Sequence, residues 1–355
     1  MDKNKLKSII ILFLLSRLLL FIFFIIDGNI HILEYYDSGL YTQIAQEGYN
    51  YTSLYAFFPL YPLSIRLLHI IIPSYKICGF LISNICSFLT IILISKLIKK
   101  EYKLSLMCLI FTPILAFLTI NYTEGLFIFL TTLGYYLYKK DKYLLSAIVV
   151  GLSMLTRNSG IILWGAIGLD MLIRLFTKRD ITFKKIVMFG LISLSIGMIY
   201  PLYLYIREGD PLIFMSMQST YWHRTPSNFI FSIYKDINVL SKFGFLVIRD
   251  FYLFFQTWFI FFLALIIGIK IYKKDTAASL YILVSLFAFQ LTDRDTSYWM
   301  GLSSVSLFRY VLGLFPIYIY LFDNNDKKYK YFITTVFITL SIINCILLYF
   351  GVFVG

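Results

Sequence analysis

The chain has 355 residues, of which 59% are hydrophobic and 14% are charged, and its mean hydropathy is +0.80. Soluble domains are about 45–50% apolar and about 25% charged, so this composition excludes an ordinary soluble protein. Apolar stretches of about 20 residues recur along the whole chain, and stretches of that length are typical of helices that cross a bilayer. The net charge of +13 therefore has to be explained within a membrane protein.

The apolar stretches predict an all-α polytopic membrane protein in which residues 1–355 form a single transmembrane unit. The first span follows a basic start, and because no small-residue cleavage site comes after it, we expect a retained anchor and not a signal peptide. The third to fifth spans are short, so we expect them to be tilted, broken or only partly inserted. The predicted spans, about 11 in all, are approximately 8–26, 76–98, 104–120, 122–138, 143–156, 159–176, 184–205, 250–272, 276–291, 305–322 and 330–352.

The basic residues are distributed unevenly over the segments between these spans. If the N-terminus is cytoplasmic, the cytoplasmic segments carry the whole net charge of +13 and the outer segments carry none. This positive-inside bias explains the charge, so the sequence predicts no nucleic-acid partner. Three long segments, about 27–75, 206–249 and 292–304, then lie on the outer side, where soluble nucleotide-sugars and ATP are not supplied. The chain also has no Walker A or dinucleotide-binding fingerprint.

The first outer loop, 27–75, contains the most suggestive carboxylate of the chain, Asp37. The apolar residues that follow it recur at helical spacing, which predicts a short helix over 38–47 that lies near the membrane plane and ends at Gly48. Asp37 would then be a helix N-cap, a catalytic carboxylate or both, because a cap position also fixes the side chain. The apolar run from Phe57 to Pro62 should lie in the membrane interface or pack against the bundle.

Two outer turns between spans carry charged side chains. Glu124 stands at the expected start of a helix, where it would complement the helix dipole or take part in a site. Arg157 joins the fifth and sixth spans and would either extend to the interface or bind an anion together with the N-terminus of the next helix.

Further along the chain, Tyr221 to Arg224 combines aromatic surface with cations, and interfacial anchoring is the alternative to a site there. The run Asp293 to Asp295 is expected to form local ion pairs, with a metal site as the alternative. Arg309 lies inside the outer end of a span, and a cation at that depth needs an anionic partner. The four cysteines form no CxxC pair and are expected to be buried small hydrophobic residues.

Taken together, these residues resemble the PIG-V-type mannosyltransferases, relatives of GPI mannosyltransferase II within the GT-C superfamily of membrane glycosyltransferases. Where the family carries Trp and Pro, this chain has Tyr36 and Phe308, whereas the aspartate is kept. The resemblance implies a GT-C-type bundle with amphipathic helices in the first outer loop. The matching segments, in chain order, are Tyr36-Asp37-Ser38, Ile44-Ala45-Gln46-Glu47-Gly48-Tyr49, Ala56-Phe57-Phe58-Pro59-Leu60-Tyr61-Pro62, Tyr122-Thr123-Glu124, Thr156-Arg157-Asn158-Ser159-Gly160 and Arg309-Tyr310.

The resemblance also implies a polyprenyl-phosphate sugar donor, typically dolichyl-phosphate mannose, and an inverting reaction. A positioned carboxylate can take the proton of the attacking hydroxyl, and arginines can stabilise the departing phosphate, so Asp37 is the expected general base. The donor phosphate is expected to bind Arg309, Arg157 and Arg224. The expected substrate-binding residues are Tyr36, Tyr122, Glu124, Asn158, Trp222 and His223.

A lipid or lipid-sugar transporter is the alternative function, and a non-catalytic scaffold is a third. No internal repeat of the transporter kind is visible, and the polar residues crowd into outer loops. The acceptor, a lipid-linked glycan, a glycolipid or a protein, stays open, as does mannose against another hexose. The sequence predicts no particular cofactor. A divalent cation stays possible, because a cation held by the donor phosphate and a single carboxylate would need no recognisable sequence motif. The expected location is a prokaryotic cell membrane, or the endoplasmic reticulum in a eukaryote.

Overall fold

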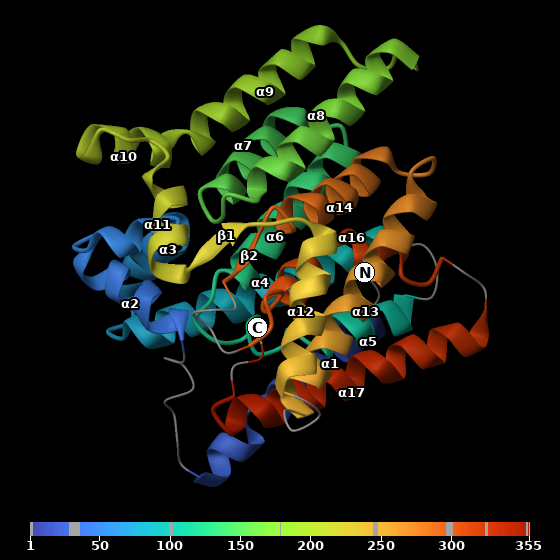
Figure 1. Ribbon diagram of the computed structural model, residues 1–355. Helices are drawn as coiled ribbons and strands as arrows, with labels where there is room; N and C mark the ends of the chain where they lie inside the picture. Colours follow the sequence, from blue (N-terminus) through green and yellow to red (C-terminus); the bar gives the residue numbers. More distant parts are fainter. Residues whose placement is uncertain are drawn as a thin grey trace.

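The computed structural model describes residues 3–27, 36–98, 102–177, 179–243, 248–295, 301–323, 326–352 and 354. These are mostly helical, which confirms the predicted all-α membrane class, with one small ribbon of two strands (Figure 1). Parts of the three predicted outer segments, 28–35, 244–247 and 296–300, lie outside the described residues. In chain order the elements are α1 (Lys3–Asp27), α2 (Asp37–Glu47), η2 (Thr52–Ala56), α3 (Leu60–His69), α4 (Tyr75–Leu97), α5 (Tyr102–Ile110), α6 (Glu124–Lys139), α7 (Tyr143–Met154), α8 (Gly160–Thr177), α9 (Phe183–Gly197), α10 (Ile199–Glu208), α11 (Ile213–Trp222), β1 (Arg224–Pro226), α12 (Phe229–Phe243), α13 (Ile248–Ile271), α14 (Thr276–Phe289), β2 (Thr292–Arg294), α15 (Leu307–Leu312), α16 (Pro316–Tyr320) and α17 (Lys327–Tyr349).

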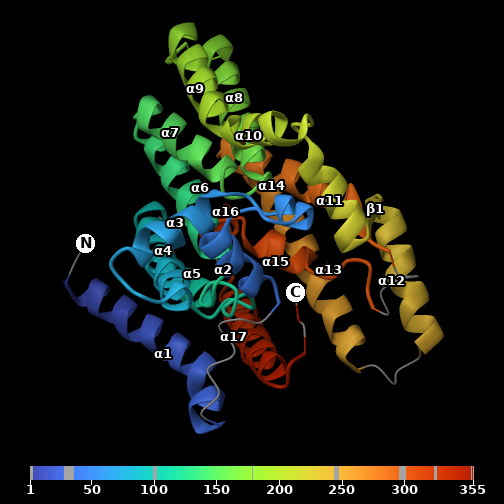
Figure 2. The same cartoon turned by 90° about the vertical axis from the view of Figure 1, so that its left-hand side faces the viewer.

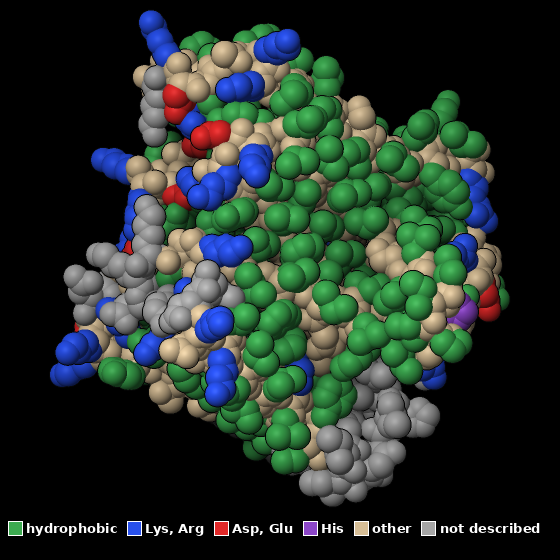
Figure 3. All heavy atoms as spheres, turned by 180° about the vertical axis from the view of Figure 1, so that it is seen from behind, with side chains coloured by type: hydrophobic (Ala, Val, Ile, Leu, Met, Phe, Trp, Pro, Cys, Tyr) green, Lys and Arg blue, Asp and Glu red, His purple; other side chains and the backbone are tan. Residues whose placement is uncertain are grey.

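Among the described residues, 5 helical stretches are long and apolar enough to cross a membrane: α4, α8, the run Phe183–Glu208 that contains α9 and α10, α13 and α17. These 5 stretches do not establish the predicted number of spans, which is about 11. From behind, the molecule presents a broad face covered by hydrophobic side chains, with most of the visible Lys and Arg along one edge and a smaller group along the opposite edge (Figure 3). Such a face suits contact with lipid.

The predicted span 104–120 is broken, in agreement with the expectation for the short spans, because α5 ends at Ile110 and the chain then runs through irregular turns to α6. Pro113 disfavours a helix here, and the freed backbone carbonyls need other donors. Side chains of α4 and α17 supply them. Asn84 Nδ2 donates to Thr119 O (2.9 Å) and Ser87 Oγ to Leu118 O (2.8 Å). Asn344 Nδ2 donates to Pro113 O (2.9 Å).

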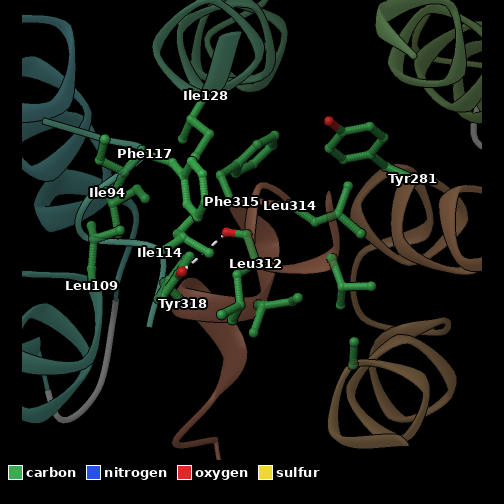
Figure 4. Close-up of a cluster of buried hydrophobic side chains, with 14 of the residues drawn as sticks. Ile94, Leu109, Ile114, Phe117, Ile128, Tyr281, Leu312, Leu314, Phe315 and Tyr318 are labelled. Atoms are coloured by element: carbon green, nitrogen blue, oxygen red, sulfur yellow. Dashed lines mark hydrogen bonds between the residues drawn. The ribbon is translucent and has the colours of Figure 1, made fainter. Parts of the chain in front are cut away.

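The predicted span 305–322 is also broken, into the short helices α15 and α16. Pro316 lacks the amide proton that a continuous helix would use there. The Tyr318 hydroxyl donates to Leu312 O across the break (3.0 Å) and lies 2.9 Å from Thr112 Oγ1 of the other irregular segment. The two interruptions therefore pack on each other, around a cluster of buried apolar side chains (Figure 4).

The helix predicted over 38–47 is confirmed by α2, which lies beside α3 and α4 in both ribbon views (Figures 1 and 2). Its apolar side packs inward, with Ile44 and Ala45 buried, and Gly48 ends it with a φ of 80°. Arg66 of α3 binds the last turn of α2, because its Nε donates to Ala45 O (2.6 Å). A cation at this end also complements the helix dipole.

The ribbon pairs β1 with β2 in antiparallel fashion, and strands this short gave no sequence signal. Asp293 anchors it: its carboxylate accepts from Lys235 Nζ of α12 (2.9 Å) and from Ser227 Oγ (2.6 Å). The expectation of purely local ion pairs over Asp293 to Asp295 is therefore wrong for Asp293. In the described part of the chain, no three His, Cys, Asp or Glu residues gather into a group that could hold a metal. The four cysteines are buried and unpaired, as expected.

Candidate active site

Asp37 is the first residue of α2, and the structure does not use its side chain as an N-cap. Tyr36 occupies the cap position, and no side chain caps this helix. The half-buried Asp37 carboxylate makes no hydrogen bond or ion pair with any described residue. The capping interpretation is therefore wrong, and the carboxylate is left available for another partner.

The backbone around Asp37 is held by two tyrosines that were predicted as substrate-binding residues. The Asp37 amide donates to the hydroxyl of Tyr122, which is 1% exposed (3.1 Å). Tyr36 has a positive φ of 56°, which is uncommon for a residue with a side chain, and its hydroxyl donates to Gly351 O (2.9 Å). These contacts position Asp37 through its backbone.

Glu124 begins α6, as predicted, and links two of the predicted arginines. Its Oε1 lies 2.6 Å from Arg157 Nη1 and 3.4 Å from Arg309 Nε. Glu124 is 3% exposed, so its charge is buried and requires these partners. Glu124 therefore does more than complement the helix dipole, since it joins segments that are far apart in sequence.

Arg309 confirms the expectation of an anionic partner at the outer end of its span. It is 5% exposed, and its guanidinium carbon lies 4.8 Å from the Phe117 ring and 5.5 Å from the Tyr122 ring. Arg157 does not extend to the interface, because it pairs with Glu124 and its Nη1 also donates to Thr123 Oγ1 (3.2 Å). Both guanidiniums point into the protein.

Tyr310 is the centre of the cluster, and sequence reasoning included it only as part of a motif. The guanidinium carbons of Arg157, Arg224 and Arg309 lie 5.0, 5.7 and 5.2 Å from its ring centre. Arg224 Nη2 donates to its hydroxyl (3.2 Å), and Arg309 Nη2 does so more weakly (3.4 Å). The three predicted phosphate-binding arginines thus meet on one aromatic side chain, as cation–π contacts allow.

The remaining predicted site residues, Trp222, His223 and Asn158, differ in their surroundings. Trp222 packs edge-on against Phe57 of the first outer loop, with ring centres 5.2 Å apart. His223 ends α11 in a left-handed conformation (φ 50°) and leads directly into β1. Asn158 is exposed, and no contact joins its side chain to the arginines. The structure therefore brings Trp222 and His223 to the border of the site and leaves Asn158 on the surface.

The electrostatics of the site favour an anion. Burial has the largest effect and raises the pKa of the Asp37 carboxyl. The three arginines Arg309, Arg294 and Arg157 lower this pKa, and Glu124 raises it. Arg224 and Tyr310 line a small cavity of about 10 Å³. That space holds about one water molecule, so a larger ligand requires the surrounding side chains to move.

We expect Glu124→Gln to destabilise the fold strongly. Glutamine keeps the shape, but it leaves two buried guanidiniums without their carboxylate, and removing one partner of a buried ion pair costs about 3–5 kcal/mol. Thermal or denaturant unfolding in detergent checks this. A loss of only about 0.3–1 kcal/mol would mean that Glu124 merely complements the dipole of α6.

Comparison with known proteins identifies the family. A family model described as Mannosyltransferase (PIG-V) matches residues 13–223, which is more than half of the chain and contains Asp37, Glu124 and Arg157. Arg224, Arg309 and Tyr310 lie beyond the matched part. No curated protein and no solved structure matches the chain. The family is that of membrane glycosyltransferases predicted from the motifs, and the chain belongs to the PIG-V mannosyltransferases.

Proposed function

We propose that this glycosyltransferase moves a sugar, which its family implies is mannose, from a polyprenyl phosphate to a hydroxyl of a lipid-linked glycan, a glycolipid or a protein. Asp37 is the general base. Arg224, Arg309 and Arg157 provide the positive charge for the donor phosphate. The fold is of the GT-C type, and the reaction inverts the anomeric carbon.

One observation carries this proposal. The half-buried Asp37 carboxylate has no partner among the described residues, yet it stands at a fixed position beside a cluster of arginines. A structural carboxylate in such surroundings would be expected to pair with the nearest guanidinium, as Glu124 does. An unpaired carboxylate next to concentrated positive charge suits a reaction in which a hydroxyl loses a proton and a phosphate leaves.

The chemistry balances in a single displacement. The acceptor oxygen forms a bond to the anomeric carbon, and the bond from that carbon to the phosphate oxygen breaks. The electron pair of the broken bond stays on the phosphate, whose charge becomes more negative, and the hydroxyl proton passes to Asp37. Arginines placed around the departing oxygen stabilise the transition state more than the ground state. A β-linked donor would give an α-mannoside.

The proposed orientation places the Asp37 loop on the outer side. The apolar face of Figure 3 has most of its Lys and Arg along one edge, which suits a cytoplasmic edge. A lipid-phosphate donor can diffuse in the bilayer and present its sugar on the other side. The proposed setting is a prokaryotic cell membrane.

Radiolabelled transfer tests the proposed function. Purified protein in liposomes receives either a polyprenyl-phosphate mannose or a nucleotide-mannose, together with a mixture of glycolipid acceptors. We expect label in the acceptor only with the lipid donor. Transfer from the nucleotide-sugar alone would contradict the proposed donor, and movement of the lipid-sugar across sealed vesicles without transfer would favour the transporter alternative.

The pH dependence of transfer should report Asp37. The base works only when ionised, so the rate falls as the pH drops through the Asp37 pKa, and burial raises that pKa above its ordinary value. We therefore expect the acid midpoint of the rate profile to lie above the ordinary aspartate value of about 3.9. Because Arg309 lowers this pKa, Arg309→Leu should move the midpoint to higher pH. An unchanged midpoint would show that another group limits the rate.

A further inference from the structure

The ribbon of β1 and β2 places two arginines directly opposite each other. In its antiparallel register Arg224 pairs with Arg294, and Thr225 pairs with Asp293. Side chains of directly opposite residues lie on the same face of the ribbon, with Cβ atoms about 4.5–5.5 Å apart. Arg224 and Arg294 are both half-buried, so neither side chain is fully exposed to solvent.

Like charges in this arrangement repel each other. Burial lowers the pKa of Arg294, and Arg224 lowers it further. Arg224 donates to the hydroxyl of Tyr310 (3.2 Å), and no carboxylate pairs with Arg224 among the described residues. Cations that lie directly opposite each other on a ribbon repel, and an anion bound between them would be attracted by both.

The ribbon adjoins the arginine cluster and is bonded to the segment that precedes α15. Arg224 of β1 donates to Tyr310 (3.2 Å), the residue on which the arginines meet, and Arg294 lies opposite Arg224 in the ribbon. Arg294 N donates to Ser303 O (3.2 Å), and fully buried Asp236 of α12 accepts from both the amide (2.7 Å) and the hydroxyl (2.8 Å) of Ser303. These bonds tie β2 to the segment that leads into α15 and Arg309.

We propose that Arg224 and Arg294 form a clamp for one phosphate group, and that its ligand is the phosphate of the polyprenyl donor. This inference rests on the proposed function and adds Arg294 to the site. The clamp takes up charge as the bond between the anomeric carbon and the phosphate oxygen breaks and the electron pair remains on the phosphate. It therefore binds the product, a lipid phosphate monoester, more tightly than the sugar-bearing diester. Both arginines lie beyond the part of the chain that the family model matches.

Binding of a short-chain product analogue tests the clamp. Purified full-length protein is titrated with farnesyl phosphate, farnesol and inorganic phosphate, and dissociation constants are measured by calorimetry. We expect farnesyl phosphate to bind best, and Arg294→Gln or Arg224→Gln to weaken it by about 10- to 100-fold, as for the loss of a charged hydrogen bond. Because both side chains hold one group, the double variant should lose less than the product of the two single losses. Lys273→Gln, which removes an exposed charge elsewhere, serves as the matched control and should change nothing.

Arg294→Lys keeps the charge but loses the planar fork, so we expect a smaller but measurable loss. If Arg294→Gln does not fold, Arg294→Lys decides the test. Wild-type affinity in the folded Arg294 variants would overturn the clamp, and so would losses that simply multiply in the double variant. Equal affinity for inorganic phosphate would overturn the lipid source of the ligand. Transfer by the wild-type protein is measured in parallel: if it occurs while the Arg294 variants bind normally, the clamp fails and the proposed function stands.

Discussion

Asp37→Asn is expected to lower the transfer rate by a factor on the order of 10²–10⁴, which is the typical contribution of a positioned general base. Asparagine has nearly the same size and cannot accept the proton of the acceptor hydroxyl. Asp37 contacts the fold through its backbone amide, which donates to Tyr122, and this bond remains in the variant. We therefore expect the variant to fold and to bind the donor much as the wild type does. Steady-state and single-turnover transfer assays with purified donor provide the measurement.

Asp210→Asn is the matched control for this change. Asp210 is exposed and only accepts from the Leu212 amide through its Oδ1, a contact that asparagine can keep. This control should transfer at the wild-type rate. If Asp37→Asn also turned over at nearly the wild-type rate, Asp37 would not be the base.

Arg309→Leu is expected to have the second largest effect, a loss on the order of 10²–10³ in turnover, as for a removed group that stabilises developing negative charge. Leucine preserves much of the packing against Phe117, while Glu124 keeps its shorter ion pair with Arg157. The fold should therefore survive, although the phosphate loses a buried cation. Turnover and donor affinity, measured together, separate binding from catalysis.

Arg309→Lys should lie between the wild type and Arg309→Leu, because lysine keeps the charge but cannot present two parallel N–H groups. Arg179→Leu, which removes an exposed arginine, is the control and should leave turnover unchanged. An active Arg309→Leu variant would mean that Arg309 serves only to pair with Glu124.

The helix α2 and the start of α6 could be predicted from sequence because their signals are local. Apolar spacing and Gly48 define α2, and a charged residue after an outer turn marks Glu124 as a helix start. The anionic partner of Arg309 could also be anticipated, since an unpaired cation inside a span is expensive. The identity of that partner, Glu124, depended on packing between distant segments.

The short length of 104–120 allowed a broken span there, but the position of that break and the break in 305–322 could not be recognised from hydropathy. An apolar stretch is equally suited to a continuous helix and to a buried irregular segment, and Pro113 and Pro316 only weaken the helical alternative. The decisive factor is whether other side chains can bind the freed carbonyls, as Asn84 and Asn344 do here. Such donors are supplied by tertiary structure and leave no periodic pattern.

The ribbon and the role of Tyr310 were missed for the same reason. Strands of three residues have no recognisable period, and the two strands lie 65 residues or more apart in sequence, so their register is a long-range property. Three arginines from three segments meet on the Tyr310 ring. Each arginine was a candidate in the sequence, but their common centre became evident only in the structure.

A structure of the protein with a bound polyprenyl-phosphate sugar would show directly whether Asp37 and the arginines act on the donor. We expect the phosphate oxygens to lie within hydrogen-bond distance of Arg309 and Arg224, and the sugar to lie between this phosphate and the Asp37 carboxylate. A donor phosphate bound away from these arginines, or an Asp37 carboxylate on the side of the phosphate away from the anomeric carbon, would contradict it.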